Sequence, residues 1–238
     1  MQRVKGISGS TLKIIAMISM LTDHTAAVLL EDILAGGLLT EQQGYAVYGI
    51  MRRLIGRLAF PVFCFLLVEG FEKTGNKRKY AGRLFLFALI SEIPFNLAFY
   101  GSIWEIRYQN IFFTLGLGLF MMIGMETIKK KCRRLWFVLF GEAVLFFITA
   151  LAAQLIHCDY GAKGIAAIAL LYIFRRNKAE QLLAGCIAFL WEITAPLAFI
   201  PIAFYNGSRG LKLKYAFYVF YPAHLLLLYV ISRICFKY

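Results

Sequence analysis

Charge is scarce in this sequence of 238 residues. Only 16% of the residues are charged and 61% are hydrophobic, whereas soluble domains carry about 25% charged and about 45–50% apolar residues. Such an apolar excess has no water-facing surface on which to lie. The composition therefore argues against a soluble globular enzyme, excludes a disordered or coiled-coil chain and indicates a membrane protein.

The common motifs of catalysis and metal binding are missing as well. No G-x-S-x-G, Walker, Rossmann or H-E-x-x-H pattern occurs, which argues against the common hydrolases, nucleotide-driven motors and zinc proteases. The five cysteines stand singly, without metal-site spacing, so we expect unpaired thiols and no metal. The net charge of +13 would suit nucleic acid, but no soluble domain is present to bind it, and we expect no nucleic-acid partner.

Apolar runs fill most of the chain. About 20 apolar residues cross a bilayer as a helix, and good candidates are 12–30, 54–71, 84–100, 111–128, 135–156 and 216–234. Two further runs are less regular: 162–174 is short, and 181–204 carries two prolines, which kink or break helices. The sequence therefore predicts an all-α, polytopic bundle of about eight to ten membrane segments, forming one transmembrane domain over residues 1–238.

Lysine and arginine cluster at the N-terminus and after the runs 54–71, 111–128 and 162–174. Because basic residues concentrate in cytoplasmic loops, this alternation predicts a multi-pass cell-membrane protein with a cytoplasmic N-terminus. The intervening loops are charge-poor or mixed, and Arg52 and Arg53 are expected in one of them. Arg209, Lys212 and Lys214 break the pattern if every run crosses once. Either the short run does not span or the proline-containing run crosses more than once, and the sequence leaves both open.

Several ionisable residues lie inside the apolar runs, where each costs about 2.5–3.5 kcal/mol near the bilayer centre. They are Asp23 and His24 in 12–30, Arg57 and Glu69 in 54–71, Glu92 in 84–100, Glu142 in 135–156, Glu192 in 181–204 and His224 in 216–234. Such residues mark functional sites by default. Charges of both signs also permit a purely structural network of pairs.

Asp23 and His24 give the sharpest local signal. Adjacent helix positions point about 100° apart, so we expect Asp23 to meet a basic residue of another helix, with Arg57 the leading candidate. His24 then faces a cavity, where a neutral imidazole suits proton abstraction, or it merely bonds a backbone carbonyl or a hydroxyl. Both residues interrupt the first run, which favours a retained helix over a cleaved signal peptide.

His224 follows Pro222, which frees a backbone carbonyl and suits a polar side chain that lines a cavity. Chemistry alone does not rank His224 against His24 as a proton acceptor. A different feature is the stretch 205–210, Tyr-Asn-Gly-Ser-Arg-Gly, which precedes Lys212 and Lys214. Its glycines and cations can bind phosphate oxygens, or they form an ordinary solvated loop.

Ordered motifs along the whole chain resemble the TraX family, integral membrane proteins associated with N-terminal acetylation of pilin. The matching stretches are residues 12–17 with Asp23-His24, 57–63 with 69–70, 91–96, 109–114, 159–161, 205–207 with 209–210, and 217–218 through 221–222 and 224. They run in order from the first helix to the last, so the resemblance covers nearly all of the sequence.

The resemblance implies an enzyme, because the family is itself similar to larger membrane acyltransferases that use an early-helix histidine and take acyl groups from coenzyme A. It implies acetyl-CoA as co-substrate and His24 as the matching histidine. The acceptor that the resemblance implies is an amine or hydroxyl, such as that of a protein N-terminus, a sugar or a small amine, and pilin is not assumed. Asp23 would orient or tune the site, and Arg57, Glu69 and Glu92 would complete its polar lining.

Acyl transfer needs a base for the nucleophile and a donor for the developing oxyanion. We expect Asp23 with His24 or His224 to be catalytic, and Asn110, Asn96, Tyr221 or Arg57 to supply the donor. The expected cofactor-binding residues are Arg57, Asn110, Tyr205, Asn206, Arg209, Lys212 and Lys214, and the expected substrate-lining residues are Glu69, Glu92, Asn96 and Tyr221.

Two other functions stay open on the sequence. A proton-coupled secondary transporter also uses intramembrane Asp, Glu and His, although such transporters normally show paired repeats, and none is evident here. A non-catalytic membrane assembly subunit is the third possibility, and it would tolerate the loss of both His24 and His224.

Overall fold

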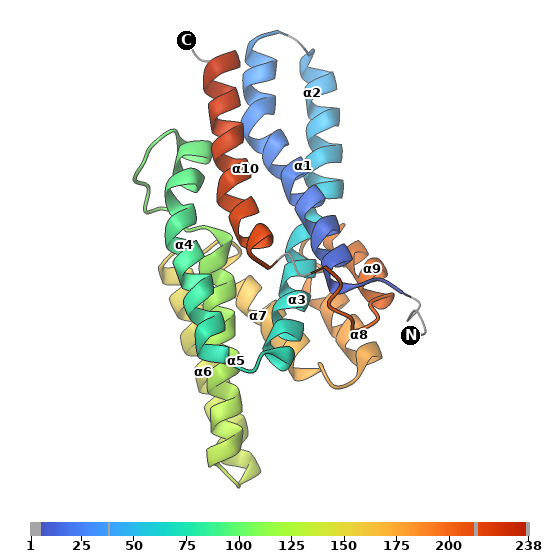
Figure 1. Cartoon of the computed structure of the whole chain (residues 1–238), viewed down its shortest axis with the longest axis vertical. Coiled ribbons are helices and arrows are strands. Elements are labelled where there is room, and N and C mark those ends of the chain that lie inside the picture. The colour runs from blue at the N-terminus through green and yellow to red at the C-terminus, as the bar shows by residue number, and fades with distance from the viewer. Residues whose placement is uncertain (1–5, 38, 212–213, 237–238) are drawn as a thin grey trace. The chain divides into compact units, whose positions relative to one another are not determined.

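A computed structural model describes residues 6–37, 39–211 and 214–236 of the protein. In these ranges the chain is helical, with isolated β-bridges but no strands (Figure 1), which confirms the all-α prediction. The α-helices are α1 (Gly9–Ala35), α2 (Glu41–Tyr48), α3 (Ala59–Lys73), α4 (Lys77–Tyr100), α5 (Ile111–Lys131), α6 (Leu135–Leu155), α7 (Gly161–Ile173), α8 (Lys178–Ala188), α9 (Phe199–Ala203) and α10 (Lys214–Cys235). Short π- and 3-10 helices, η1 (Gly49–Ile55), η2 (Gly56–Leu58) and η3 (Ala195–Ala198), complete the set.

Within the described ranges, six stretches are long and apolar enough to cross a bilayer: Gly9–Leu30, Glu41–Lys73, Lys77–Tyr100, Ile111–Lys131, Leu135–Leu155 and Tyr215–Cys235. The protein is therefore a multi-pass membrane protein, with fewer full-length spans than the eight to ten segments predicted. Helix α7 has only 13 residues and reaches about 20 Å. The run 181–204 is not one helix, because α8 ends at Ala188 and the chain turns before η3 and α9, each of which contains a proline.

The helices form two compact units, each assembled from separate parts of the chain. Unit 1 comprises Met1–Phe63, Ile90–Glu105 and Phe189–Tyr238, and unit 2 comprises Cys64–Leu89 and Ile106–Ala188. Helices α3 and α4 continue from one unit into the other. The expectation of a single domain stays a prediction.

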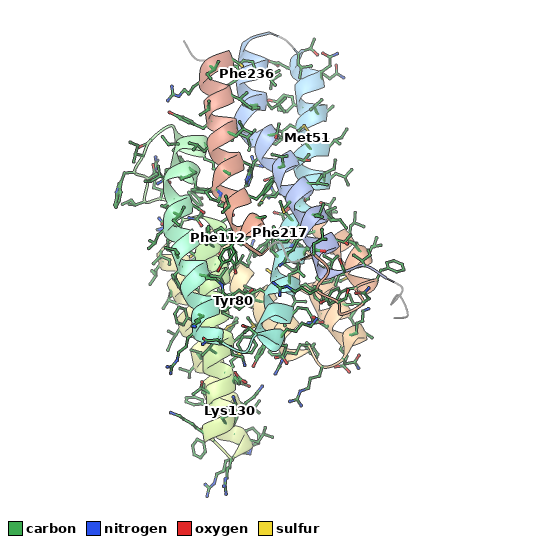
Figure 2. All side chains as sticks on the ribbon, viewed as in Figure 1. Met51, Tyr80, Phe112, Lys130, Phe217 and Phe236 are labelled. Atoms are coloured by element: carbon green, nitrogen blue, oxygen red, sulfur yellow. The ribbon has the colours of Figure 1, made fainter. Side chains whose placement is uncertain are left out.

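In unit 1, α1 and α10 run side by side in the same direction (Figure 1). Three contacts mark their alignment. The Nζ atom of Lys13 lies 4.8 Å from the centre of the Phe217 ring, His24 bonds His224, and the Ser232 hydroxyl donates to Asp32 at 2.6 Å. We call these six residues the α1–α10 seam. Phe217 is labelled in Figure 2 near the beginning of α10.

The second span changes its winding halfway along. Helix α2 begins with a capping box made by Thr40 and Gln43 and continues through the π-helix η1 and the 3-10 helix η2 into α3. Side-chain hydroxyls bond three carbonyls along η1 and η2: Ser19 donates to Ile55 at 2.6 Å and to Gly56 at 3.0 Å, and Thr194 donates to Arg53. A π-turn widens the helix and often marks a functional position.

Arg52 and Arg53 lie in η1, inside the span Glu41–Lys73. The expectation that they occupy a loop between spans is therefore wrong. Their charge made the apolar run seem to begin at residue 54, whereas the continuous helical span begins at Glu41 and includes both arginines.

Unit 2 is built mainly from α5, α6, α7 and α8, each packed against the next. Its core includes Leu119, Met122 and Ile168, which are fully buried. Cations that lie near the ends of its helices pair with carboxylates. These pairs are Lys73–Glu69, Lys77–Glu126, Lys130–Glu126, Lys129–Glu142 and Arg175–Glu72. We call them the unit 2 ion-pair network, and Lys130 is labelled in Figure 2 near the end of α5.

Candidate functional site

The two intramembrane histidines, 200 positions apart in the sequence, are in direct contact. Nδ1 of His24 lies 2.7 Å from Nε2 of His224, and the two rings are within 4° of parallel. Nδ1 of His224 lies 2.7 Å from the carbonyl oxygen of Phe220, one turn earlier in α10. The structure thus brings together the two residues that the sequence offered as alternative bases.

Aromatic rings surround the pair. Phe220 stacks on His224 with centroids 4.7 Å apart, and Tyr221 meets both imidazoles edge-on. The Phe99 ring of α4 meets His24 edge-on at 5.4 Å. His224 is only 4% exposed, whereas His24 is partly exposed. The rings restrict how either imidazole can turn and leave His24 as the more accessible member.

Asp23 meets a basic residue of another segment, as expected, but not the expected one. Its Oδ1 lies 3.6 Å from Nε of Arg52, and Arg52 donates to the Tyr48 hydroxyl at 2.5 Å. Arg57, the predicted partner, lies 3.0 Å from Glu192. The charges of Arg52, Arg57 and Glu192 all act on Asp23, so these residues form one polar cluster beside the histidine pair.

The Asp23–Arg52 pair is close but imperfect. Both atoms are buried, and within the described ranges neither Oδ1 of Asp23 nor Nε of Arg52 makes a hydrogen bond. Gly56 is what allows α1 to come so near, because a Cβ atom at that position would lie 2.5 Å from Oδ1 of Asp23. A buried polar pair without its hydrogen bonds has capacity left for a ligand or a water molecule.

The segment 204–211 folds against the beginning of α1. Ile7 donates to Phe204 at 2.8 Å, Asn206 donates back to Ile7 at 3.0 Å, and the amides of Gly9 and Ser10 donate to Ser208 and Arg209. Four different residues of the predicted phosphate-binding stretch or its edge therefore hold the beginning of α1, and the stretch lies at the same end of α1 as residues 7–10. The side of the membrane on which 205–211 lies, which the sequence left open, is thus the side of α1's first residues.

The other residues predicted for this stretch are only partly described. The Asn206 side chain accepts from the amide and hydroxyl of Ser208, and Tyr205 forms the β-bridge with Ile7. Lys212 lies outside the described residues. Lys214 begins α10, but its side chain lies outside the description too.

Asn96 and Glu92 lie on α4 within unit 1. The Asn96 amide donates to the Ile103 carbonyl at 3.3 Å, whereas its Oδ1, in a side chain only 2% exposed, has no hydrogen-bond partner among the described residues. Asn96 comes one helical turn before Phe99, the residue that touches His24. The side-chain oxygen of Asn96 is therefore a buried acceptor that can take a hydrogen bond from a ligand.

Two predicted site residues belong to unit 2 instead. Glu69 pairs with Lys73 at 2.6 Å. Asn110 is fully buried and caps α5: its Oδ1 accepts from the Phe112 amide and its Nδ2 donates to the Ala88 carbonyl at 2.8 Å. Both ends of the Asn110 amide are thereby in use, so the structure gives it a structural task.

Sequence reasoning missed Arg52 and Ser19 as neighbours of the site, and it read Lys13 only as a marker of orientation. Arg52 was assigned to a loop, and Ser19 has no local motif. The charge of Arg209 acts on Lys13, so a second cation lies near the predicted phosphate-binding stretch. The sequence feature that could have identified Lys13 was its position, four residues after the first helix begins at Gly9.

The arrangement has two chemical capacities. The imidazole pair can accept and pass on a proton in an aromatic, membrane-embedded setting. The end of unit 1 where α1 begins presents cations on a segment that is tied down by backbone hydrogen bonds, and anions bind well to such preorganised donors. Among the described residues, no group of three or more His, Cys, Asp or Glu side chains forms a metal site.

Comparison with protein families gives one match that covers nearly the whole chain. A family described as "TraX protein" matches residues 8–232. This range contains the histidine pair, the polar cluster and the stretch 204–211.

A named relative is similar along its full length. The "Probable fimbrial assembly protein FimC, serogroup H1" of Dichelobacter nodosus is 30% identical over 266 aligned residues, which cover 96% of this chain and 97% of the relative. No solved structure matches the chain significantly.

Proposed function

Since the chain belongs to the TraX family, we propose that it is an integral membrane acyltransferase that moves an acetyl or related acyl group from acyl-CoA to an amine or hydroxyl acceptor. The acceptor we favour is a protein N-terminus handled during fimbrial assembly. The name of the similar relative, a probable fimbrial assembly protein, supports that process.

The observation that carries the proposal is the hydrogen-bonded histidine pair. In the reaction, the acceptor's nitrogen attacks the thioester carbonyl and its proton passes to an imidazole. The C–S bond then breaks, and the coenzyme A thiolate takes up a proton. A neutral imidazole is the side chain best suited to receive and return a proton near neutral pH.

Residues at the beginning of α1 suit the anionic part of acyl-CoA. Lys13 and Arg209 lie close enough for their positive charges to interact. In the described ranges no ion pair joins either of them to a carboxylate. Lys212 and Lys214 follow in sequence. We propose that this end of unit 1 is cytoplasmic, where acyl-CoA is available, and that Arg209 and Lys13 bind its phosphates.

The acceptor amine needs a partner that holds it toward the thioester. The unpartnered Oδ1 of Asn96 can accept one of its N–H groups. Oxyanion donors are available nearby in Tyr221, which lies edge-on to both imidazoles, and in the arginines of the polar cluster.

The test is release of coenzyme A by the purified protein in lipid nanodiscs, with acetyl-CoA and a synthetic peptide that has a free N-terminus. We expect His24→Ala to lower turnover by at least about 100-fold, the usual contribution of a general base. His157→Asn is the matched control: it removes the exposed third histidine from a site with φ +53°, which asparagine tolerates. Unchanged turnover in His24→Ala would reject His24 as the base.

The same preparation separates the rival function. A proton-coupled transporter would move a solute into proteoliposomes when a pH gradient is imposed, and it would neither bind acetyl-CoA nor release coenzyme A. A non-catalytic assembly subunit would give neither signal.

A further inference from the structure

We propose that His224 is a positioning residue: it fixes the proton of His24 on Nδ1, so that Nε2 of His24 is the atom that accepts the acceptor's proton. The catalytic consequence rests on the proposed function. The assignment of the protons rests on the hydrogen bonds alone.

The first step is the proton on His224. Its Nδ1 lies 2.7 Å from the Phe220 carbonyl oxygen, which can only accept a hydrogen bond. Nδ1 of His224 must therefore carry a proton. A neutral His224 then has a lone pair on its other nitrogen, Nε2.

The second step follows from the contact between the rings. Nε2 of His224 lies 2.7 Å from Nδ1 of His24, and a bond between them needs one donor and one acceptor. If His224 is neutral, its Nε2 accepts, and Nδ1 of His24 carries the proton. A neutral His24 then has its own lone pair on Nε2.

The alternative needs a cationic imidazole. No ion pair joins either histidine to a carboxylate in the described ranges, the surrounding groups are the rings of Phe99, Phe220 and Tyr221, and the nearby charge of Arg52 is itself positive. An unpaired charge in such surroundings is costly. The neutral pair, with both protons on Nδ1, is the arrangement that the contacts favour.

This arrangement also divides the two roles. Both nitrogens of His224 are in use, and its side chain is buried. His24 uses only Nδ1 in the hydrogen bonds of the described residues, and it is partly exposed. When Nε2 of His24 gains a proton, its Nδ1–H bond to His224 becomes charge-assisted and stronger. His224 therefore stabilises the transient imidazolium without itself touching substrate.

The protons can be observed directly, because the chain has only three histidines. In nanodiscs that contain the full chain with ¹⁵N-labelled histidine, His24→Ala, His224→Gln and His157→Asn assign the ring signals. We expect both His24 and His224 to show a protonated Nδ1 and an unprotonated Nε2. A wild-type His24 with a bare Nδ1 and a protonated Nε2 overturns the assignment.

Two substitutions of His224 test the role. His224→Phe keeps a ring but removes the acceptor. We expect kcat to fall by at least about 100-fold, the smaller contribution of a general base, and by up to about 10,000-fold, the loss seen when a catalytic histidine is held in the wrong tautomer. The KM for acetyl-CoA should stay unchanged within about twofold. His224→Gln can return an acceptor oxygen near the position of Nε2, so we expect it to restore at least about tenfold over His224→Phe and to keep the proton of His24 on Nδ1.

The outcomes distinguish this inference from the proposed function. Equal kcat in the wild type and His224→Phe contradicts the positioning role, as does a His24 proton that stays on Nδ1 in His224→Phe. If His224→Phe fails to fold, the wild-type spectrum still tests the proton assignment, and the turnover of His224→Gln still tests the positioning role. If both His24 and His224 carry a proton on Nδ1 but the protein transfers no acyl group, the assignment of the protons is supported and the proposed chemistry is rejected.

Discussion

Both units place charged or titratable side chains on membrane helices, but they do so in different ways. In unit 2, four cations that lie near helix ends, Lys77, Lys129, Lys130 and Arg175, each pair with a carboxylate. In unit 1, the α1–α10 seam joins His24 to a second histidine, and beside it the Asp23–Arg52 pair lacks a hydrogen bond between its closest atoms.

This contrast indicates which charges are structural. Ion pairs whose side chains keep contact with water, such as Lys130–Glu126, neutralise one another and need no further partner. An exception in unit 2 is Glu142, whose Oε1 is buried without a hydrogen bond in the described ranges although Lys129 lies 3.0 Å away. Polar groups in the middle of a span have no water to bond. In unit 1 such unsatisfied atoms lie on Asp23 and Arg52, next to the histidine pair, and this position, rather than the lack of a hydrogen bond alone, indicates a ligand. We expect substitutions in the polar cluster of unit 1 to have larger effects than matched ones in the unit 2 ion-pair network.

The largest stability effect should follow Asp23→Asn. The change leaves the Arg52 guanidinium partly buried without its counter-charge, and because both side chains keep some exposure we expect a loss of about 2–3 kcal/mol. Denaturant titration in detergent measures it. Glu126→Gln in unit 2 is the matched carboxylate removal, with an expected loss below about 1 kcal/mol, since Lys130 reaches water. Equal losses would contradict the distinction between the units.

Gly56→Ala should have the next largest effect. The new methyl group would lie 2.5 Å from Oδ1 and 2.6 Å from Cβ of Asp23, so α1 or η2 must shift, at a cost of about 1–2 kcal/mol. Gly49→Ala, at the first residue of the neighbouring π-helix η1, meets nothing within 4 Å and should be close to neutral. Thermal unfolding of the two variants compares them, and a Gly49→Ala shift as large as that of Gly56→Ala would refute the close-approach argument.

Lys130→Ala should have the smallest effect. The lysine side chain is 73% exposed, and Glu126 keeps Lys77 as a partner. We expect the unfolding free energy to change by less than about 0.5 kcal/mol and coenzyme A release to stay within about twofold of wild type. A loss of activity above tenfold would place function in unit 2.

The sequence was sufficient for the helical class and for most spans, because a 20-residue apolar run is a strong and local signal. It failed at the second span. Arg52 and Arg53 argued for a loop, yet they lie in a π-helix within the helical span Glu41–Lys73, and Ser19 and Thr194 donate hydrogen bonds to carbonyls of that π-helix. Nothing in a single sequence marks an i→i+5 turn, and the only hints were Gly49 and Gly56 on either side of it.

The candidate site was predicted as residues but not as contacts. His24 and His224 were named separately, since a contact over 200 positions depends on how α1 and α10 align. Asp23 was expected to meet a basic residue, but Arg57 was chosen because Arg52 had been assigned to a loop. The position of 205–211 was undecided because charge counting fixes sides only when the number of crossings is known. Backbone hydrogen bonds place this stretch at the same end of α1 as residues 7–10.

The most direct measurement of the central claim is transfer of label from [¹⁴C-acetyl]-CoA to a peptide N-terminus by the wild-type protein in nanodiscs, beside His24→Ala and His157→Asn. The account predicts labelled peptide, with coenzyme A released in equal amount, from the wild type and His157→Asn, and at least about 100-fold less from His24→Ala. Equal labelling by all three proteins would contradict the role of His24. A folded wild type that binds acetyl-CoA but labels no acceptor amine or hydroxyl would contradict the acyltransferase itself.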